Sequence, residues 1–254
     1  MQKTLISIIG STGIGKTKLA IEMAKHIGTE IISCDSRQFF KEMKIGTATP
    51  TDEELAQAKH HFIGHLSVQD YYSIGQYEED ALEKIEEIFE KNDFAVLVGG
   101  SMMYEKAVVE GLNDLPEANA ENQEKLQKIL DEEGLEKLQE ILKNLDEEYY
   151  NVVHKENPRR LLRAIDVIWQ TGRKYSEIIA EPKHKRDFKV VRIGITAPRE
   201  IMYERINLRV DKMLENGLID EVKSLTEYQK LVPLQTVGYT EIFKYLEGTW
   251  DLDF

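Results

Sequence analysis

The most constraining feature of the sequence is a glycine-rich loop near its start, Gly10-Ser11-Thr12-Gly13-Ile14-Gly15-Lys16-Thr17. An apolar run at residues 5–9 precedes the loop, and apolar residues at helical spacing follow it. This order predicts a strand, a turn and a helix, the context in which the pattern G-x-x-x-x-G-K-[ST] binds phosphate. The N–H groups of such a loop and the helix N-terminus attract an anion. The sequence therefore predicts a site for a diphosphate or triphosphate.

The last two residues of the loop add specific chemistry to this site. Lys16 supplies a mobile cation, and the hydroxyl of Thr17 can bind a metal ion that is shared with the phosphates. The loop predicts what binds and does not predict the reaction.

Further apolar stretches predict the rest of a parallel sheet. Residues 30–34 form a short stretch that ends at Asp35, and residues 94–98 are wholly apolar, which is typical of a buried parallel strand. In such sheets ligands bind beyond the carboxyl ends of the strands. We therefore expect Asp35 to face the same crevice as the glycine loop, although aspartate is also favoured as a helix cap.

The strand predicted at residues 94–98 ends in Gly99-Gly100-Ser101 and not in an acidic residue. Many nucleotide hydrolases with this loop place an aspartate at such a strand end to hold Mg²⁺. The difference disfavours a motor protein or a GTPase. Ser101 instead offers a hydroxyl at the edge of the sheet, where it can also cap a helix.

From about residue 113 the pattern becomes helical, and a strand pattern returns at residues 189–196. We predict an α/β fold with a P-loop NTPase-like parallel sheet flanked by helices. Residues 1–112 and 187–254 form this core, and residues 113–186 form an all-helical insertion. A long helix after residue 198 bears Arg205 and Arg209, and either side chain could reach the phosphates.

One helix of the insertion has an unusual concentration of arginine. Asn157 as the cap, Pro158 at the first helical position and Gly172 as the terminator define it. Arg159, Arg160 and Arg163 lie in its first turns, where cations oppose the helix dipole at a cost of a few tenths of a kcal/mol. This unfavourable placement suggests that the arginines bind phosphate.

The distribution of charge supports a nucleic-acid partner despite a net charge of −13. Residues 110–156 contain 14 acidic and 5 basic side chains, whereas residues 157–190 contain 9 basic and 4 acidic ones. A protein can bind RNA with one basic face while the remaining surface stays acidic.

Composition also indicates the cellular compartment. The single cysteine, Cys34, excludes a disulfide within the chain and suits a reducing environment, and we expect it to be a small buried residue at a strand end. No apolar run approaches the ~20 residues of a membrane span, and the first strand begins too early for a signal peptide. We expect a cytoplasmic protein without membrane contact.

Taken in order, the motifs of the chain resemble those of the bacterial tRNA dimethylallyltransferases, also called tRNA isopentenyltransferases. Each motif after the glycine loop is weak alone, whereas the ordered set is specific and covers nearly the whole chain. The motifs are residues 10–17, 35–38, 46–48, 60–61, 72–73, 99–104, 157–164 and 235–239.

The resemblance implies a prenyl transfer. Dimethylallyl diphosphate would bind through its diphosphate to residues 10–17, and the N6 amine of the adenosine 3′ of a tRNA anticodon would attack its C1 carbon. Asp35 matches the general base of the family. Lys16, Arg209 and a Mg²⁺ ion bound at Thr17 would stabilise the departing diphosphate. Ser101 matches a residue that orients the leaving group or the base.

The resemblance also implies how tRNA is held. The helical insertion would grip the anticodon stem–loop, Arg37 and Gln38 would touch the flipped adenosine, and Asp35, Ser36 and Ser101 would also contact the tRNA. The remaining tRNA contacts that it implies are Gln123, placed by approximate position, and Arg159, Arg160, Leu161, Leu162 and Arg163. We expect the enzyme to be a monomer.

The sequence departs from the family pattern at two points. Ile14 replaces a smaller residue in the glycine loop, and the sequence ends at Phe254, whereas family members usually continue into a basic, aromatic segment.

Three alternatives stay open at this point. A small-molecule kinase would use the same loop to bind ATP, and the Gly-Gly-Ser strand end and the basic helix argue against it. An adenylate isopentenyltransferase would prenylate a free nucleotide, and the arginine-bearing insertion argues for tRNA instead. An inert RNA-binding module would have no use for Lys16, Thr17 and Asp35.

Overall fold

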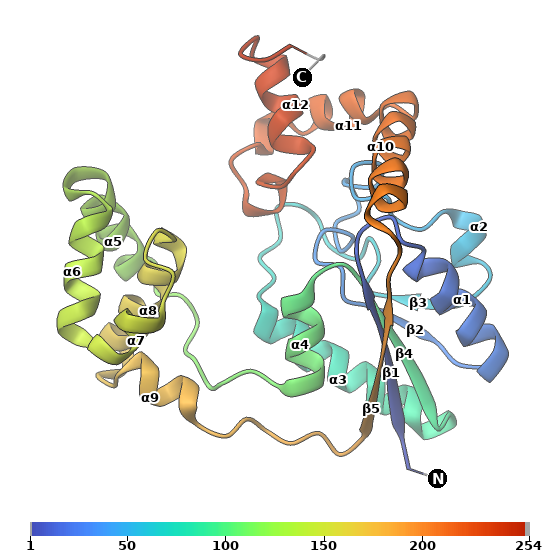
Figure 1. The fold of residues 1–254 in the computed structure, drawn as a ribbon, viewed down its shortest axis with the longest axis horizontal. Coiled ribbons are helices and arrows are strands. Elements are labelled where there is room, and N and C mark those ends of the chain that lie inside the picture. Colours follow the sequence, from blue (N-terminus) through green and yellow to red (C-terminus); the bar gives the residue numbers. More distant parts are fainter. Residues whose placement is uncertain (1, 252–254) are drawn as a thin grey trace. The chain divides into compact units, whose positions relative to one another are not determined.

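The structure is a computed structural model that describes residues 2–251, and its first compact unit is built around a parallel β-sheet (Figure 1). Within the described residues the sheet has five strands in the order β3-β2-β4-β1-β5, and every pair of neighbours is parallel. The strands are β1 (Thr4–Gly10), β2 (Ile31–Ser33), β3 (His60–His61), β4 (Phe94–Val98) and β5 (Lys189–Ile195). The predicted α/β class is confirmed.

Alternate residues of the longer strands enter two separate apolar layers, one on either face of the sheet. In β4, Ala95 and Leu97 join one cluster of buried side chains, whereas Val96 and Val98 join the other. This alternation follows from the two-residue period of a strand. Since helices cover both faces, the strands read as continuous apolar runs in the sequence.

The helices of the first compact unit follow the strands in the expected order. They are α1 (Lys16–Ile27), α2 (Asp52–Leu55), α3 (Ile74–Lys91), α4 (Met102–Glu110), α10 (Arg199–Glu215), α11 (Leu218–Ser224) and α12 (Tyr239–Leu246), with the short 3₁₀ helices η1 (Thr226–Tyr228) and η2 (Val232–Leu234). Helix α1 packs on one face of the sheet through Ala20, Ile21 and Ala24. Helices α3, α4, α11 and α12 contribute buried side chains to the cluster on the other face.

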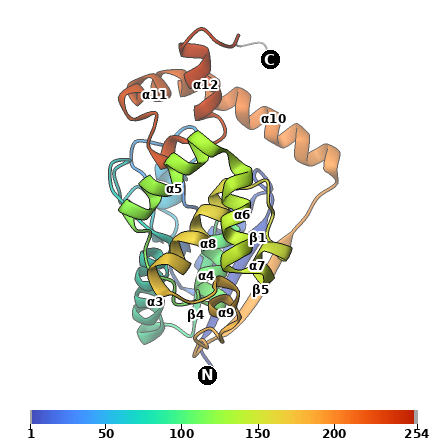
Figure 2. The same ribbon diagram turned by 90° about the vertical axis from the view of Figure 1, so that its left-hand side faces the viewer.

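The remaining helices form a second compact unit, Gly111–Lys185 (Figure 2). The first unit runs to Glu110 and resumes at Arg186, against the expected insertion of residues 113–186. The second unit contains α5 (Ala120–Glu133), α6 (Leu135–Leu145), α7 (Glu147–Val152), α8 (Pro158–Thr171) and α9 (Tyr175–Ala180). Its core is a cluster of its own around Leu126, Leu138, Leu142 and Leu161.

Several local predictions can be compared with these elements. Asn157 caps α8, which ends at Gly172, as predicted. Residues 113–119 were expected to be helical but precede the first helix of the unit, in a segment that contains Pro116. Strand β3 was not predicted, because two residues are too short for a periodic pattern.

In the part of the chain that the structure describes, no helix combines the length and the apolar character needed to cross a membrane.

Candidate functional site

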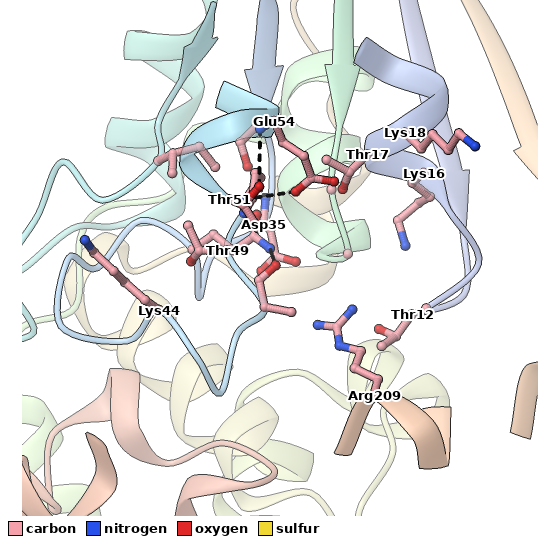
Figure 3. Close-up of a pocket in the computed structure, with 18 of the residues that line it drawn as sticks. Thr12, Lys16, Thr17, Lys18, Asp35, Lys44, Thr49, Thr51, Glu54 and Arg209 are labelled. Carbon is pink, nitrogen blue, oxygen red and sulfur yellow. Dashed lines mark hydrogen bonds between the residues drawn. The ribbon is translucent and has the colours of Figure 1, made fainter. Parts of the chain in front are cut away.

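A cavity of about 810 Å³ opens at the carboxyl edge of the sheet, where β1, β2 and β4 end (Figure 3). Its lining comes from the glycine loop, the ends of β2 and β4, residues 44–52 and one face of α10. All of these segments belong to the first compact unit. The position is the one expected for ligand binding in a parallel α/β sheet. We refer to this cavity as the pocket.

The glycine loop turns tightly between β1 and α1. Gly15 has φ +103° at the position immediately before α1 and Gly13 has φ +76°, backbone conformations that side chains rarely tolerate. Gly10 lies against β5, where a Cβ atom would stand 2.7 Å from the carbonyl oxygen of Ile195. The glycines of the motif are therefore required by the path of the backbone.

Lys16 is folded over the loop that it terminates. Its Nζ donates hydrogen bonds to the carbonyl oxygens of Gly10 and Ser11, both at 2.9 Å. Burial lowers the pKa of Lys16; the charge of Asp35 opposes this shift and that of Arg209 reinforces it. The charges of Lys16, Asp35 and Arg209 therefore influence one another, and Figure 3 shows the three side chains among those that line the pocket.

The side chains of the glycine loop differ in whether they face the pocket. Ile14 is buried, and its side chain lies against Gly10. Its N–H donates to the carbonyl oxygen of Ser11 at 3.4 Å. Ile14 therefore shapes the loop, whereas Thr12 and Thr17 line the pocket.

Asp35 stands at the end of β2, beside the end of β4. Its Oδ1 accepts the N–H of Arg37 at 3.1 Å. A Cβ atom on Gly100 would stand 2.8 Å from Asp35 Oδ2, and one on Gly99 would stand 2.5 Å from the carbonyl carbon of Cys34. The Gly-Gly pair therefore lets the two strand ends approach closely enough to place Asp35 in the pocket.

Ser101 contacts the residue after Asp35. The Ser101 Oγ accepts the N–H of Ser36 at 3.0 Å and lies 2.9 Å from the Ser36 hydroxyl. These two bonds hold the turn that carries Asp35. Cys34 is buried, and burial raises the pKa of its thiol well above the usual range, as expected for a packing residue and not for a nucleophile.

Arg205 and Arg209 lie one helical turn apart on α10 and both line the pocket. Arg205 Nη1 donates to the carbonyl oxygen of Ile14 at 3.2 Å, and Arg209 Nη2 donates to that of Thr47 at 3.1 Å. Burial lowers the pKa of Arg209, and the charge of Asp35 opposes this shift. Arg205 was not among the predicted catalytic residues, although its spacing of four from Arg209 could have indicated a shared face.

Arg37 and Gln38, two predicted site residues in the turn after Asp35, donate hydrogen bonds to neighbouring loops. Arg37 Nη1 donates to the carbonyl oxygen of Val232 at 3.3 Å. Gln38 Nε2 donates to the carbonyl oxygens of Thr47 and Ala48, both at 3.1 Å. The structure thus brings the glycine loop, Asp35 and Gln38 together around one pocket, whereas Ser36, Arg37 and Ser101 are not among the residues that line it.

The histidine pair divides between two environments. His61 Nε2 lies 2.6 Å from a carboxylate oxygen of Glu30. His60 lines the pocket, its Nδ1 lies 2.8 Å from the carbonyl oxygen of Ala58, and burial lowers its pKa. Both belong to β3, the strand at one edge of the sheet.

Metal binding can be tested on the donor atoms that line the pocket. Among residues 2–251 no cluster of three or more His, Cys, Asp or Glu side chains could hold a metal ion. Mg²⁺ often needs no such cluster, because it binds through one or two protein oxygens, substrate phosphates and water. Thr17 provides such an oxygen in the pocket. The residues present fit a magnesium ion that arrives with a diphosphate.

In the second unit, the basic helix α8 presents its arginines unequally. Arg159 and Arg160 are exposed. Arg163 is half-buried, and its guanidinium donates to the carbonyl oxygen of Pro116 and to buried Asp166, at 3.3 Å from the carboxylate. Arg159 and Arg160 are therefore better placed for RNA than Arg163, whose guanidinium supports the fold of the unit.

The predicted contact of Leu161 and Leu162 with tRNA is not compatible with their side chains. Leu161 is fully buried and Leu162 is 9% exposed, and both belong to the apolar core of the second unit. They occur in the motif because α8 needs an apolar face on which to pack. Gln123 lies in the first turn of α5 and is half-buried.

Comparison with known proteins gives one consistent family. The family model described as IPP transferase matches residues 38–254. A tRNA dimethylallyltransferase of Christiangramia forsetii is 50% identical over 253 residues, which are 100% of this chain and 84% of that protein. A tRNA dimethylallyltransferase 1 of Bacteroides thetaiotaomicron is 45% identical over 251 residues, 99% of this chain and 82% of that protein.

Solved structures agree with these relatives. The full-length tRNA isopentenylpyrophosphate transferase of Bacillus halodurans superposes with a TM-score of 0.68 at 33% identity, over 100% of this chain and 80% of that one. A eukaryotic dimethylallyltransferase acting on tRNA superposes with a TM-score of 0.83 at 27% identity, over 97% of this chain and 64% of that one. With its glycine loop, its Asp35 turn and its helical insertion, this chain belongs to the IPP transferase family of tRNA dimethylallyltransferases.

Proposed function

We propose that this chain transfers the dimethylallyl group of dimethylallyl diphosphate to N6 of the adenosine 3′ of a tRNA anticodon and releases diphosphate. The observation that carries the proposal is the pocket, in which a phosphate-binding loop and Arg209 share one cavity with the carboxylate of Asp35. Cations suit the leaving diphosphate, and a carboxylate suits the acceptor amine. The family relationship makes tRNA the acceptor that we infer.

The diphosphate end of the reaction uses the glycine loop. Backbone N–H groups of residues 10–17 and the N-terminus of α1 would bind the phosphate oxygens. Lys16 would exchange its two carbonyl partners, Gly10 and Ser11, for phosphate oxygens that bind a cation more strongly. Arg209 would add a second cation at the same place. These charges stabilise the negative charge that develops as the bond from C1 to oxygen breaks.

Thr17 is the residue that would hold Mg²⁺ in this site. When bound, the ion would neutralise charge on the diphosphate and so make it a better leaving group. The loop N–H groups, Lys16 and Arg209 contribute the same kind of stabilisation from the chain itself.

The acceptor end uses Asp35. The exocyclic amine of adenine is a weak nucleophile because its lone pair is delocalised into the ring. As the nitrogen forms its bond to C1, one amine proton would pass to Asp35, which stands at the edge of the pocket as a general base. Ser36 and Ser101 fix the turn that carries Asp35, and Arg37 and Gln38 are the residues that we assign to the flipped base.

The second unit is the part that we assign to RNA binding. Arg159 and Arg160 are exposed at the start of α8 and can bind backbone phosphates of an anticodon stem–loop. An anticodon loop releases a base from its stack more cheaply than a duplex does. We also propose that the protein acts as a monomer. We place the protein in the cytoplasm, because tRNA is present there and the free thiol of Cys34 suits a reducing compartment.

The test is transfer of label from dimethylallyl diphosphate in the presence of Mg²⁺, with unmodified tRNA, AMP or a small alcohol with ATP as separate acceptors. We expect label in tRNA without any requirement for ATP. Label in AMP would indicate prenylation of the free nucleotide, and phosphoryl transfer from ATP to the alcohol would indicate a kinase. Either result would overturn the proposal.

A further inference from the structure

One carboxylate that belongs to none of the predicted motifs binds the backbone of a loop that lines the pocket. Glu221, on α11, accepts N–H groups from Lys44, Ile45 and Gly46 at 3.0, 2.8 and 3.0 Å. It also accepts the hydroxyl of Tyr239 at 2.6 Å. Consecutive backbone N–H groups that converge on one anion form a strong, charge-assisted set of hydrogen bonds.

Tyr239 closes the same arrangement from α12. Its ring is fully buried and lies so close to Gly46 that a Cβ atom there would stand 2.5 Å from the ring. Burial, and then the hydrogen bond to Glu221, raises the pKa of the Tyr239 hydroxyl, which therefore stays a donor. We call Glu221, Tyr239 and Gly46 the clamp. It attaches the loop of residues 44–49 to the two helices after α10.

The opposite side of this loop supports two residues that the proposed reaction uses. The carbonyl oxygen of Thr47 accepts from Gln38 Nε2 and from Arg209 Nη2, each at 3.1 Å. The carbonyl oxygen of Ala48 accepts from Gln38 as well, and Ala48 has φ +45°, which is uncommon for a residue other than glycine. Such a conformation persists where the surroundings impose it. The loop thus transmits the geometry of the clamp to Gln38 and Arg209.

We propose that Glu221 is a positioning residue for the prenyl transfer, acting through the loop of residues 44–49 on Arg209 and Gln38. The proposal rests on the proposed function and adds to it a carboxylate that touches neither substrate. Its charge satisfies the N–H groups of the loop, which leaves the carbonyl groups of Thr47 and Ala48 directed at the two side chains. Without Glu221, the three N–H groups lose their acceptor and the loop can rotate.

A purely structural function for Glu221 predicts something different. Helix α11 also packs through Leu218 and Val222, both buried in the main apolar cluster, so the helix has its own attachment to the core. If Glu221 only stabilised α11, its loss would lower the amount of folded protein and leave the properties of each folded molecule unchanged. A positioning function and a purely structural function of Glu221 are therefore distinguished by kcat/KM measured per folded molecule.

The test compares Glu221→Ala with Asp220→Ala. Asp220 is the neighbouring carboxylate in the first turn of α11 and is exposed, so the control loses the same charge near the same helix end. For Glu221→Ala we expect kcat/KM for dimethylallyl diphosphate to fall about 30-fold, which is about 2 kcal/mol. The KM for tRNA should change less than about 3-fold, because the exposed arginines of α8 are untouched. Equal behaviour of the two variants would overturn the proposal.

A conservative variant keeps the test valid if Glu221→Ala folds poorly. Tyr239→Phe retains the ring against Gly46 and removes a single donor from the clamp, so its loss of kcat/KM should be smaller than that of Glu221→Ala.

A double-mutant cycle tests whether the effect of Glu221 passes through Arg209. In an Arg209→Ala background, Glu221→Ala should cost less than about 3-fold in kcat/KM for dimethylallyl diphosphate, because Arg209, through which it acts on the diphosphate, is gone. Independent, additive effects would contradict transmission through the loop.

Binding of inorganic pyrophosphate, measured by calorimetry, separates this inference from the proposed function. Glu221→Ala should weaken binding about 10-fold and Asp220→Ala should not, whether or not the protein prenylates tRNA. If the unmodified protein fails to transfer label while this difference holds, the proposed function fails and the positioning of Arg209 stands. If label transfer is normal and the difference is absent, the inference fails alone.

Discussion

Asp35 is a carboxylate placed close to two cations. Its charge acts on the pKa values of Lys16 and Arg209, and its Oδ1 is held by the N–H of Arg37. Rotation of the carboxylate is therefore restricted before any substrate binds. A general base that is already oriented saves the cost of ordering it during the reaction.

Replacing Asp35 by asparagine tests this assignment. The amide preserves the shape and the oxygen that accepts the Arg37 N–H, but it cannot take a proton. We expect kcat to fall about 10²-fold or more, the usual scale for a general base, with tRNA affinity unchanged. Asp52→Asn is the control, because Asp52 also lines the pocket and has no assigned function. Asp35→Asn with unchanged turnover would remove Asp35 from the mechanism.

Lys16 predicts a pH dependence of anion binding. Burial lowers the pKa of Lys16 from the ordinary value of 10.5. In the free protein its ammonium group therefore loses its charge at a lower pH than an exposed lysine would. Because pyrophosphate binds the charged form, its affinity should fall as pH rises through the lowered pKa. Lys16→Arg should retain its affinity over the same range, since arginine stays protonated. Parallel titration curves for the two proteins would contradict the prediction.

At the scale of elements, α8 and α10 use arginine in different ways. On α10, Arg205 and Arg209 are one turn apart and their guanidinium groups bind carbonyl oxygens around the pocket. On α8, Arg159 and Arg160 are exposed in the first turn, where their charge opposes the helix dipole. The first arrangement suits a small anion in a cavity, and the second suits an extended phosphate backbone.

The function of α8 can be measured through salt dependence. Changing Arg159 and Arg160 to alanine should weaken tRNA binding and reduce the slope of log affinity against log salt by roughly 0.7 to 0.9 for each lost phosphate contact. Lys137 and Lys143 of α6, changed together to alanine, provide a control that removes the same charge from the same unit. An unaltered slope in the arginine variant would show that the start of α8 is ordinary surface.

At the scale of the whole molecule, the fold could be predicted from the sequence where local signals were strong. The glycine loop, the apolar strands and the caps of α8 each depend on neighbouring residues, and each prediction is confirmed. Strand β3 is too short to have a period, and residues 113–119 lie among helical patterns without forming a helix. The first error comes from a strand of two residues, and the second from a segment in which Pro116 interrupts the helical pattern.

The candidate site shows the same limit more sharply. Residues 35–38 and 99–101 could be predicted to meet, because parallel strands end at one edge of the sheet. Glu221 could not be predicted to bind residues 44–46, since no local pattern links positions about 175 residues apart in the chain. Leu161 and Leu162 show the opposite error, because a motif contains both the residues that face a ligand and the residues that pack beneath them.

Prenyl transfer to tRNA is tested most directly by locating the new group on the tRNA. Unmodified tRNA is incubated with the protein, dimethylallyl diphosphate and Mg²⁺, digested to oligonucleotides, and analysed by mass spectrometry. We predict one dimethylallyl group on N6 of the adenosine immediately 3′ of the anticodon, with diphosphate released in equal amount and no ATP consumed. A tRNA that gains no dimethylallyl group, or gains it at another nucleotide, would contradict the account.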